Sequence, residues 1–153
     1  MSKSYYSLGL MSGTSGDGVD ASIIRSDGSS KYEVILDKYY KYTDEIYKEY
    51  TLLKSGINNE SDYEKYFSLW ENSLLILEAK ITLFHIDLVN EIIKNSKINI
   101  DLIGFHGQTI WHKPEFGSSR QLGNGKLLSK STKKNVIYDF RANDLKNRGQ
   151  GAP

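Results

Sequence analysis

Apolar Val19, Ala21 and Ile23 alternate with polar Asp20 and Ser22 near the start of the chain, with the two-residue period of β-strands. Residues 7–11 form a short apolar run that stops at glycine-rich residues 12–18, which predicts a buried strand and a tight turn. Residues 19–25 and 32–42 predict two further strands, separated by a turn at residues 27–30. Three consecutive strands joined by short turns predict an antiparallel meander, which departs from the opening of a Rossmann domain.

A helical period follows the meander. Residues 43–54 predict a helix, and the glycine and asparagines of residues 56–59 predict a break after it. Ser61 stands three residues before Glu64, which is the spacing of a capping box at a helix start. Apolar residues then recur every three or four positions, which predicts a long amphipathic helix over residues 61–97. We interpret its apolar stripe as core packing, with a coiled-coil seam as the alternative.

The last third of the chain alternates again between short strands and a helix. The predicted elements are strands at 102–106, 120–122 and 136–139, a helix at 125–134, and a loop at 148–153. The whole pattern predicts an α/β chain in which an antiparallel meander is followed by long helices. We expect one domain over residues 1–153, left incomplete because its last loop leads into no closing element.

Composition and charge exclude several classes of protein. The 153 residues carry 20 Lys and Arg against 19 Asp and Glu, for a net charge of +1, which excludes a generally basic nucleic-acid binder. The chain has no cysteine, which excludes disulfides, thiol catalysis and zinc–thiolate sites. It has no secretory leader and no apolar run near the roughly 18 residues of a membrane span. We therefore expect a cytoplasmic protein with no nucleic-acid or membrane partner.

The glycine-rich turn is the first candidate site. Its glycines let backbone amides approach an anion, its hydroxyls add donors, and its carboxylates suit a hydrated Mg²⁺ beside a polyphosphate. A Walker A lysine, a G-x-G-x-x-G motif and a nucleophile elbow are all missing from it. From the residues alone, a plain hairpin turn is an equal alternative to a phosphate-binding loop. The candidate residues are Gly13, Thr14, Ser15, Gly16, Asp17, Gly18, Val19 and Asp20.

Two further segments carry candidate chemistry. His106 and Gln108 stand at a predicted strand end flanked by glycines, where side chains commonly reach a ligand, and the nearby Trp111 suits a sugar. Ordinary loop residues are the alternative. Asp139 and Arg141 follow a predicted strand directly, so Arg141 could read a carboxylate in a cleft. A solvated strand exit is the alternative there.

Taken together and in order, these segments resemble the anhydro-N-acetylmuramic acid kinase family. The matching runs are residues 9–15 (Gly-Leu-Met-Ser-Gly-Thr-Ser), 17–20 (Asp-Gly-Val-Asp), 106–112 (His-Gly-Gln-Thr-Ile-Trp-His), 121–124 (Gln-Leu-Gly-Asn), 139–141 (Asp-Phe-Arg), 144 (Asp) and 149–153 (Gly-Gln-Gly-Ala-Pro). The resemblance implies the N-terminal lobe of an actin-like ATPase or sugar-kinase (ribonuclease H-like) fold. It also implies transfer of the ATP γ-phosphate to O6 of 1,6-anhydro-N-acetylmuramic acid, with opening of the anhydro ring, in cell-wall recycling.

The resemblance assigns roles to the candidate residues. It implies that residues 13–20 bind ATP, that Asp17 holds Mg²⁺ through water, and that the sugar contacts are His106, Gln108, Asp139 and Arg141. Its general-base Asp is expected beyond Pro153, so no catalytic residue is assigned in this chain. An amino sugar and ATP are the implied partners, and a homodimer is the implied assembly.

The chain also departs from the family pattern at two positions. The family usually has Leu where this chain has Gly16, and Ala142 interrupts an arginine-rich run. Because glycine loses more conformational entropy on ordering, we expect Leu at position 16 to tighten ATP binding modestly. The alternatives to a kinase lobe are a non-catalytic sugar- or nucleotide-binding remnant and a fragment that associates through its long helix.

Overall fold

A six-stranded mixed sheet forms the base of the computed structural model, which describes residues 3–59 and 63–151. The strands are β1 (Tyr5–Ser12), β2 (Gly18–Ser26), β3 (Tyr32–Lys41), β4 (Leu102–Lys113), β5 (Ser118–Leu122) and β6 (Asn135–Tyr138). Their order is β3-β2-β1-β4-β5, with β6 also paired to β4. β1, β2 and β3 form the predicted antiparallel meander, whereas β4 runs parallel to β1 and to β6. The α/β fold class is therefore confirmed.

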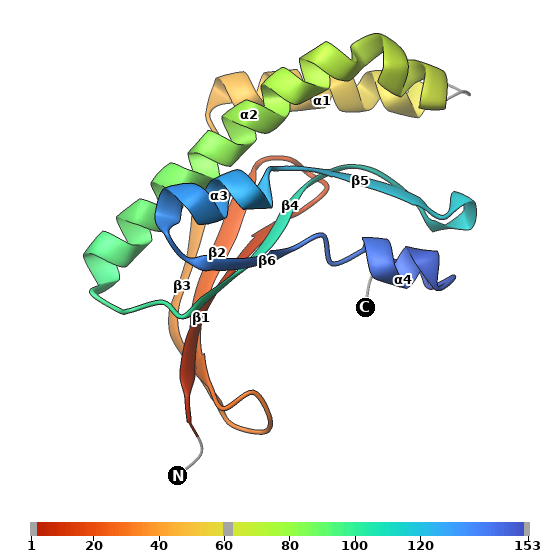
Figure 1. Ribbon diagram of the computed structural model, residues 1–153. Coiled ribbons are helices and arrows are strands. Elements are labelled where there is room, and N and C mark those ends of the chain that lie inside the picture. The colour runs from red at the N-terminus through yellow and green to blue at the C-terminus, as the bar shows by residue number, and fades with distance from the viewer. Residues whose placement is uncertain (1–2, 60–62, 152–153) are drawn as a thin grey trace.

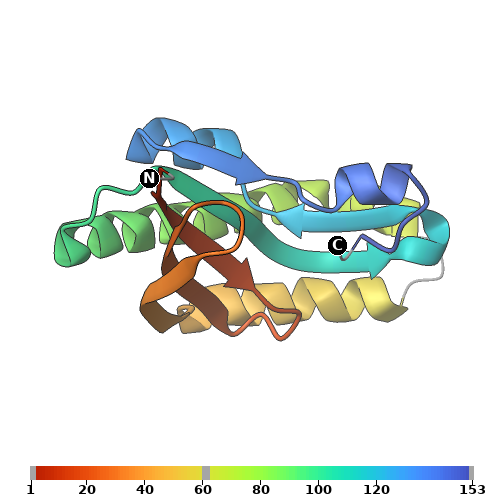
Figure 2. The ribbon, with the colours of Figure 1, turned by 90° about the horizontal axis from the view of Figure 1, so that it is seen from below.

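The helices lie mainly on one face of this sheet (Figures 1 and 2). They are α1 (Asp44–Asn59), α2 (Tyr63–Ser96), α3 (Gly125–Thr132) and the short α4 (Ala142–Lys146), with one 3₁₀ turn, η1 (Pro114–Phe116). The apolar stripe of α2 packs on the sheet, since Leu74, Leu77 and Ile81 are fully buried together with Leu8 and Ile103 of the strands. The core interpretation of the stripe is confirmed. No helix in the described ranges is long and apolar enough to span a membrane.

The predicted break at residues 56–59 is wrong, because α1 continues to Asn59. The packing of α1 against α2 requires a residue without a Cβ at position 56, because a Cβ there would lie 2.5 Å from the Tyr66 hydroxyl of α2. That hydroxyl donates to the Leu53 carbonyl of α1 at 2.7 Å. The glycine thus allows the two helices to approach closely. The proposed capping residue Ser61 lies outside the described residues.

Two further boundaries differ from the prediction. β4 was expected to end at His106 but continues to Lys113, because β5 pairs with its second half from Gln108 onward. The partner strand supplies hydrogen bonds that the local sequence pattern does not reveal. After β6, the helical turn α4 occupies residues to which the sequence pattern assigned no element.

His85 of α2 is an ionisable group at the centre of this core. Its side chain is fully buried, its Nδ1 lies 2.8 Å from the Ile81 carbonyl, and its ring meets the Phe105 ring edge-on at 4.9 Å. Burial lowers its pKa to about 4. The folded protein therefore holds a neutral imidazole where the unfolded chain, with an ordinary pKa near 6.5, takes up a proton.

We expect the stability of the protein to fall as the pH decreases from 7 to 5. Below pH 6.5 the unfolded state binds a proton at His85 that the folded state does not bind until about pH 4, so protonation favours unfolding. The difference reaches about 2 kcal/mol at pH 5. Urea unfolding at the two pH values measures it. In His85→Phe the free energy of unfolding should change less between pH 7 and pH 5. If it falls as steeply as in the unchanged chain, other groups cause the pH dependence.

Candidate functional site

Three parallel strands bring the candidate segments to one edge of the sheet. β1 ends at Ser12 and β6 ends at Tyr138, while β4 runs between them. Ser12 pairs with Gln108, and Tyr138 pairs with Phe105. Ligands of open α/β sheets bind beyond the carboxyl ends of such strands. The topology therefore brings together residues 13–18, 106–108 and 139–141, as a shared site requires.

Residues 13–18, here named the glycine loop, run from the end of β1 to Gly18, the first residue of β2. The loop closes with a hydrogen bond of 3.3 Å from the Gly16 amide to the Gly13 carbonyl, and Gly16 adopts φ +70°. The Tyr42 amide donates to the Asp17 carbonyl at 2.9 Å and fixes the exit of the loop. Thr14 and Ser15 at its tip are exposed. The loop therefore presents a short, open stretch of backbone at the edge of the sheet.

The Asp17 carboxylate is negatively charged, which suits a metal cation bound through its water ligands. Its carboxylate is exposed and accepts a hydrogen bond from the Ser15 hydroxyl, which is the main reason that its pKa is lowered. The described residues contain no group of three or more side chains that could ligate a metal by themselves. A single carboxylate beside a phosphate site fits Mg²⁺, which keeps most of its waters and takes substrate phosphates as ligands.

Two residues assigned to the nucleotide site differ in their surroundings. Asp20 is exposed on β2, where a ligand could reach it. Val19 is fully buried in the core, so its side chain supports the loop only through packing.

Gln108 lies behind the glycine loop. Its side chain is fully buried, and its Nε2 donates to the Gly13 carbonyl at 2.7 Å. Its Oε1 has no hydrogen-bond partner among the described residues. Gln108 thus joins β4 to the loop, a contact that the sequence did not reveal, and its predicted contact with a sugar stays a prediction.

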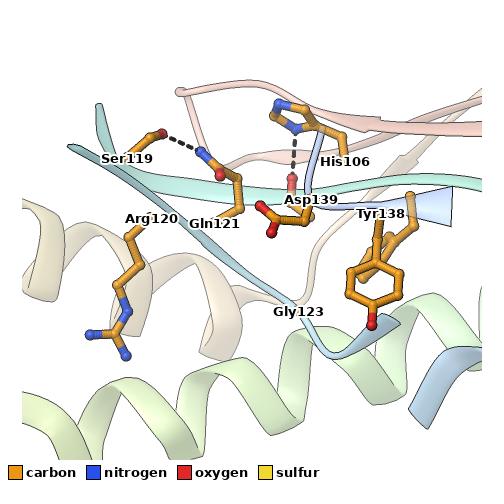
Figure 3. Close-up of a pocket in the computed structure, with 9 residues that line it drawn as sticks. His106, Ser119, Arg120, Gln121, Gly123, Tyr138 and Asp139 are labelled. Carbon is orange, nitrogen blue, oxygen red and sulfur yellow. Dashed lines mark hydrogen bonds between the residues drawn. The ribbon is translucent and has the colours of Figure 1, made fainter. Parts of the chain in front are cut away.

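A cavity of about 290 Å³ opens between β4, β5 and the end of β6 (Figure 3). Its lining residues are Phe105, His106, Gly107, Ser119, Arg120, Gln121, Gly123, Tyr138 and Asp139. The Gln121 amide donates to the Ser119 hydroxyl at 2.6 Å. Arg120 turns instead toward α2, where its guanidinium makes two hydrogen bonds of 2.9 and 3.1 Å with Glu71. Ser119 and Gln121 are therefore the polar groups that β5 offers to a ligand.

His106, which lines this cavity, forms a pair with Arg141. Arg141 donates from Nε and Nη2 to His106 Nε2, at 3.2 and 3.0 Å, so Nε2 is unprotonated and Nδ1 donates to the Gly107 carbonyl at 2.8 Å. Burial lowers the pKa of His106, and the nearby charge of Arg141 lowers it further. His106 is therefore neutral near pH 7. Asp139, which also lines the cavity, adopts φ +61°, a conformation that Asp tolerates better than most residues.

Arg141 also reaches the glycine-rich segment that follows α4. Its Nη1 donates to the Gly151 carbonyl, while the Gly151 amide donates to the Asp144 carboxylate at 2.7 Å. A Cβ at Gly149 would lie 2.2 Å from that carboxylate. Arg141 and Asp144 together hold residues 149–151 next to His106. The sequence grouped these residues, but it did not show that they bind one another.

Trp111 does not serve as a stacking surface for a sugar. Only 7% of it is exposed, and its ring meets the Phe67 ring edge-on at 6.1 Å. Its indole N–H donates to the Ser118 hydroxyl at 3.2 Å. The tryptophan belongs to the packing between β4 and α2.

The expected gain from Leu at Gly16 is overturned by the structure. A Cβ at Gly16 would lie 2.0 Å from the Tyr50 ring, and the positive φ adds strain. We expect Gly16→Leu to lower the free energy of unfolding by about 2–5 kcal/mol, from overpacking and backbone strain together. Gly28→Leu is the matched control, since Gly28 has φ +73° but nothing within 4 Å of a Cβ. Urea unfolding measures both variants. If their free energies of unfolding fall by the same amount, the contact between a side chain at position 16 and Tyr50 is not the cause.

A family model described as "Anhydro-N-acetylmuramic acid kinase" matches residues 5–153. The chain belongs to the anhydro-N-acetylmuramic acid kinase family. A relative of that name in Pelagibacter ubique (strain HTCC1062) is 56% identical over 100% of this chain and 40% of its own length. Relatives of the same name in Agrobacterium fabrum and Zymomonas mobilis are 37% and 35% identical, each over 95% of this chain. The chain spans about 40% of the length of these curated relatives.

Membership in the family agrees with the fold. The mixed sheet with helices on one face is consistent with the N-terminal lobe of an actin-like sugar kinase, as the resemblance implied. The matched residues include the glycine loop, the His106 segment and the residues around Arg141.

Proposed function

We propose that this chain supplies the N-terminal lobe of a kinase that phosphorylates O6 of 1,6-anhydro-N-acetylmuramic acid. The anhydro ring opens by hydrolysis in the same reaction, and the product is N-acetylmuramic acid 6-phosphate. One observation carries the proposal: β4 contributes His106 and Gly107 to the cavity, and the next residue of the strand, Gln108, donates to the Gly13 carbonyl of the glycine loop. A phosphate donor and a sugar acceptor need to meet at such a place.

The nucleotide part of the proposal concerns the glycine loop. Its amides receive the β- and γ-phosphates of ATP, and Asp17 holds Mg²⁺ through water beside them. The metal, when bound, neutralises charge that develops on the transferred phosphoryl group. The exposed, ionised state of Asp17 supports this role.

The sugar part of the proposal concerns His106, Asp139 and Arg141, with Gln108 predicted to assist. Asp139 and His106 line the cavity, and Arg141 is hydrogen-bonded to the neutral imidazole of His106. A carboxylate on the ligand suits the guanidinium. By family resemblance the general base is an Asp that follows the segment of residues 149–153, so no residue of this chain is proposed as the base.

The wider setting belongs to the same proposal. Residues 1–153 form one lobe-like domain, the reaction takes place in the cytoplasm as a step of peptidoglycan turnover, and two copies of the whole protein form a dimer. Family membership supports these expectations.

The test joins residues 1–153 to the remaining part of the Pelagibacter ubique relative and measures ADP release with ATP, Mg²⁺ and the anhydro sugar. The fusion should turn over, whereas the 153-residue chain by itself should show no measurable turnover. General-base catalysis contributes about a hundred- to ten-thousand-fold, and positioning of the reactants contributes more. Turnover by the chain alone at the rate of the fusion would contradict the assigned roles. A folded fusion that binds both ligands without turnover would favour a non-catalytic binding protein.

A further inference from the structure

The carbonyl groups at the start of the glycine loop accept hydrogen bonds from side chains of β4 and α1. Gln108 donates to the Gly13 carbonyl, and the Thr14 carbonyl accepts from the Tyr50 hydroxyl at 2.9 Å and from the Lys54 ammonium. Gln108 and Tyr50 are 0% and 1% exposed. Both carbonyls therefore point toward β4 and α1, where Lys54 is partly exposed.

The direction of these carbonyls determines where the amide hydrogens of the loop point. In a trans peptide the C=O and the N–H point in opposite directions. The Gly13 carbonyl shares its peptide with the Thr14 amide, and the Thr14 carbonyl shares its peptide with the Ser15 amide. Both amides therefore point away from β4 and α1, at a loop tip whose residues are exposed. Successive amides turned to one side make a concavity that binds phosphate oxygens.

The Tyr50 hydroxyl faces more hydrogen-bond acceptors than it has protons to donate. Its hydroxyl oxygen lies 2.9 Å from each of two carbonyl oxygens, those of Thr14 and Thr109. A phenol has one proton to donate, and burial raises the pKa of Tyr50 to about 12, so the hydroxyl stays neutral near pH 7. Lys54 supplies a second donor to the Thr14 carbonyl. Gln108 Nε2 likewise supplies a second donor to the Thr109 carbonyl, at 3.4 Å, so the hydroxyl proton can be donated to Thr14.

Lys54 also brings a positive charge next to the peptide whose amide faces outward. The ammonium borders a cavity of about 290 Å³, whose lining is formed by Thr14, Lys54 and residues 109–113. This space can accommodate the larger guanidinium of arginine, which donates hydrogen bonds and keeps the charge. Lys54→Arg is therefore a conservative replacement, whereas Lys54→Met removes both the donor and the charge.

We propose that Tyr50 and Lys54 of α1 are positioning residues for a phosphate chain bound at the glycine loop. They hold the Thr14 carbonyl inward, keep the Thr14 and Ser15 amides turned toward the ligand, and add one positive charge behind it. The proposal rests on the proposed function, because it takes these amides as the phosphate ligands. Neither residue touches the phosphate in this arrangement.

The test uses the 153-residue chain and titrates it with magnesium pyrophosphate while following the Thr14 and Ser15 amide signals by NMR. In the unchanged chain both signals should shift in a saturable way. Lys54→Met and Tyr50→Phe should each raise the apparent Kd about tenfold, the size expected when a charge-assisted or buried hydrogen bond is lost. Lys54→Arg should stay within about twofold of the unchanged chain.

Lys48→Met is the matched control, because Lys48 is an exposed lysine of the same helix. It removes the same charge and should leave the Kd unchanged. A general loss of structure is separated by thermal unfolding and by titration with the anhydro sugar, which Lys54→Met should bind as before. An arginine variant as weak as the methionine variant would overturn the positioning role.

The two proposals fail in different ways. If pyrophosphate shifts neither amide in the unchanged chain, the loop is not the phosphate site and the proposed function fails at that point. If the amides respond normally in the unchanged chain and equally well in Lys54→Met and Tyr50→Phe, only the role of α1 is wrong.

Discussion

Asp17→Asn in the fused kinase is expected to lower kcat by about a hundredfold and to raise the Mg²⁺ concentration needed for half-maximal rate. The carboxylate is exposed and ionised, so its substitution removes a fixed negative charge from the position proposed beside the metal. Asn can still accept the hydrogen bond from the Ser15 hydroxyl, and the Asp17 carbonyl keeps its bond to the Tyr42 amide. The loop should therefore keep its shape. The measurement is kcat as a function of Mg²⁺ concentration.

Asp27→Asn is the control for this variant. Asp27 is a second aspartate whose pKa is lowered by hydrogen bonds within its own turn, but it follows β2 at the end remote from the glycine loop. Its substitution should change neither kcat nor the metal requirement. If Asp17→Asn also leaves both quantities unchanged, Asp17 does not hold the metal.

Gly13→Val is expected to weaken ATP binding at least about a hundredfold while leaving the fold intact. A Cβ at Gly13 meets only the Ser15 hydroxyl oxygen, at 3.6 Å, so the loop has space for it. The branched side chain would instead occupy the surface over which the phosphates approach the Thr14 and Ser15 amides. Isothermal titration calorimetry with ATP and Mg²⁺ measures the loss.

Binding of the anhydro sugar should change little in Gly13→Val, because the groups proposed for it, His106 and Arg141, lie across the sheet edge on β4 and before α4. Gly9→Val is the matched control: its Cβ has open space in β1, 3.9 Å from the Ser22 carbonyl oxygen. If Gly13→Val binds ATP normally, the glycine loop is a simple hairpin turn and does not bind the phosphates.

Much of the fold could be predicted because it depends on local periodicity. A short apolar run before a glycine-rich turn predicted β1, and two-residue alternation predicted β2. The three-to-four spacing of apolar residues predicted the buried face of α2. The glycines and hydroxyls of the loop indicated an anion site, and the ordered motif runs indicated the family. These features can be read from neighbouring residues, because strand, helix and turn geometry act over a few positions.

The sequence by itself thus determined the meander, the core stripe, the candidate segments and the family. Only the tertiary structure decided what each side chain contacts. Gly56 lies within α1 where Tyr66 of α2 packs against it, and Trp111 packs on Phe67. Gln108 donates a hydrogen bond to the glycine loop. Tyr50 and Lys54 carry no sequence signal for their role, since they meet Thr14 from a helix far along the chain. Such contacts depend on how the sheet and helices pack together, and the spacing of residues along the chain does not encode that packing.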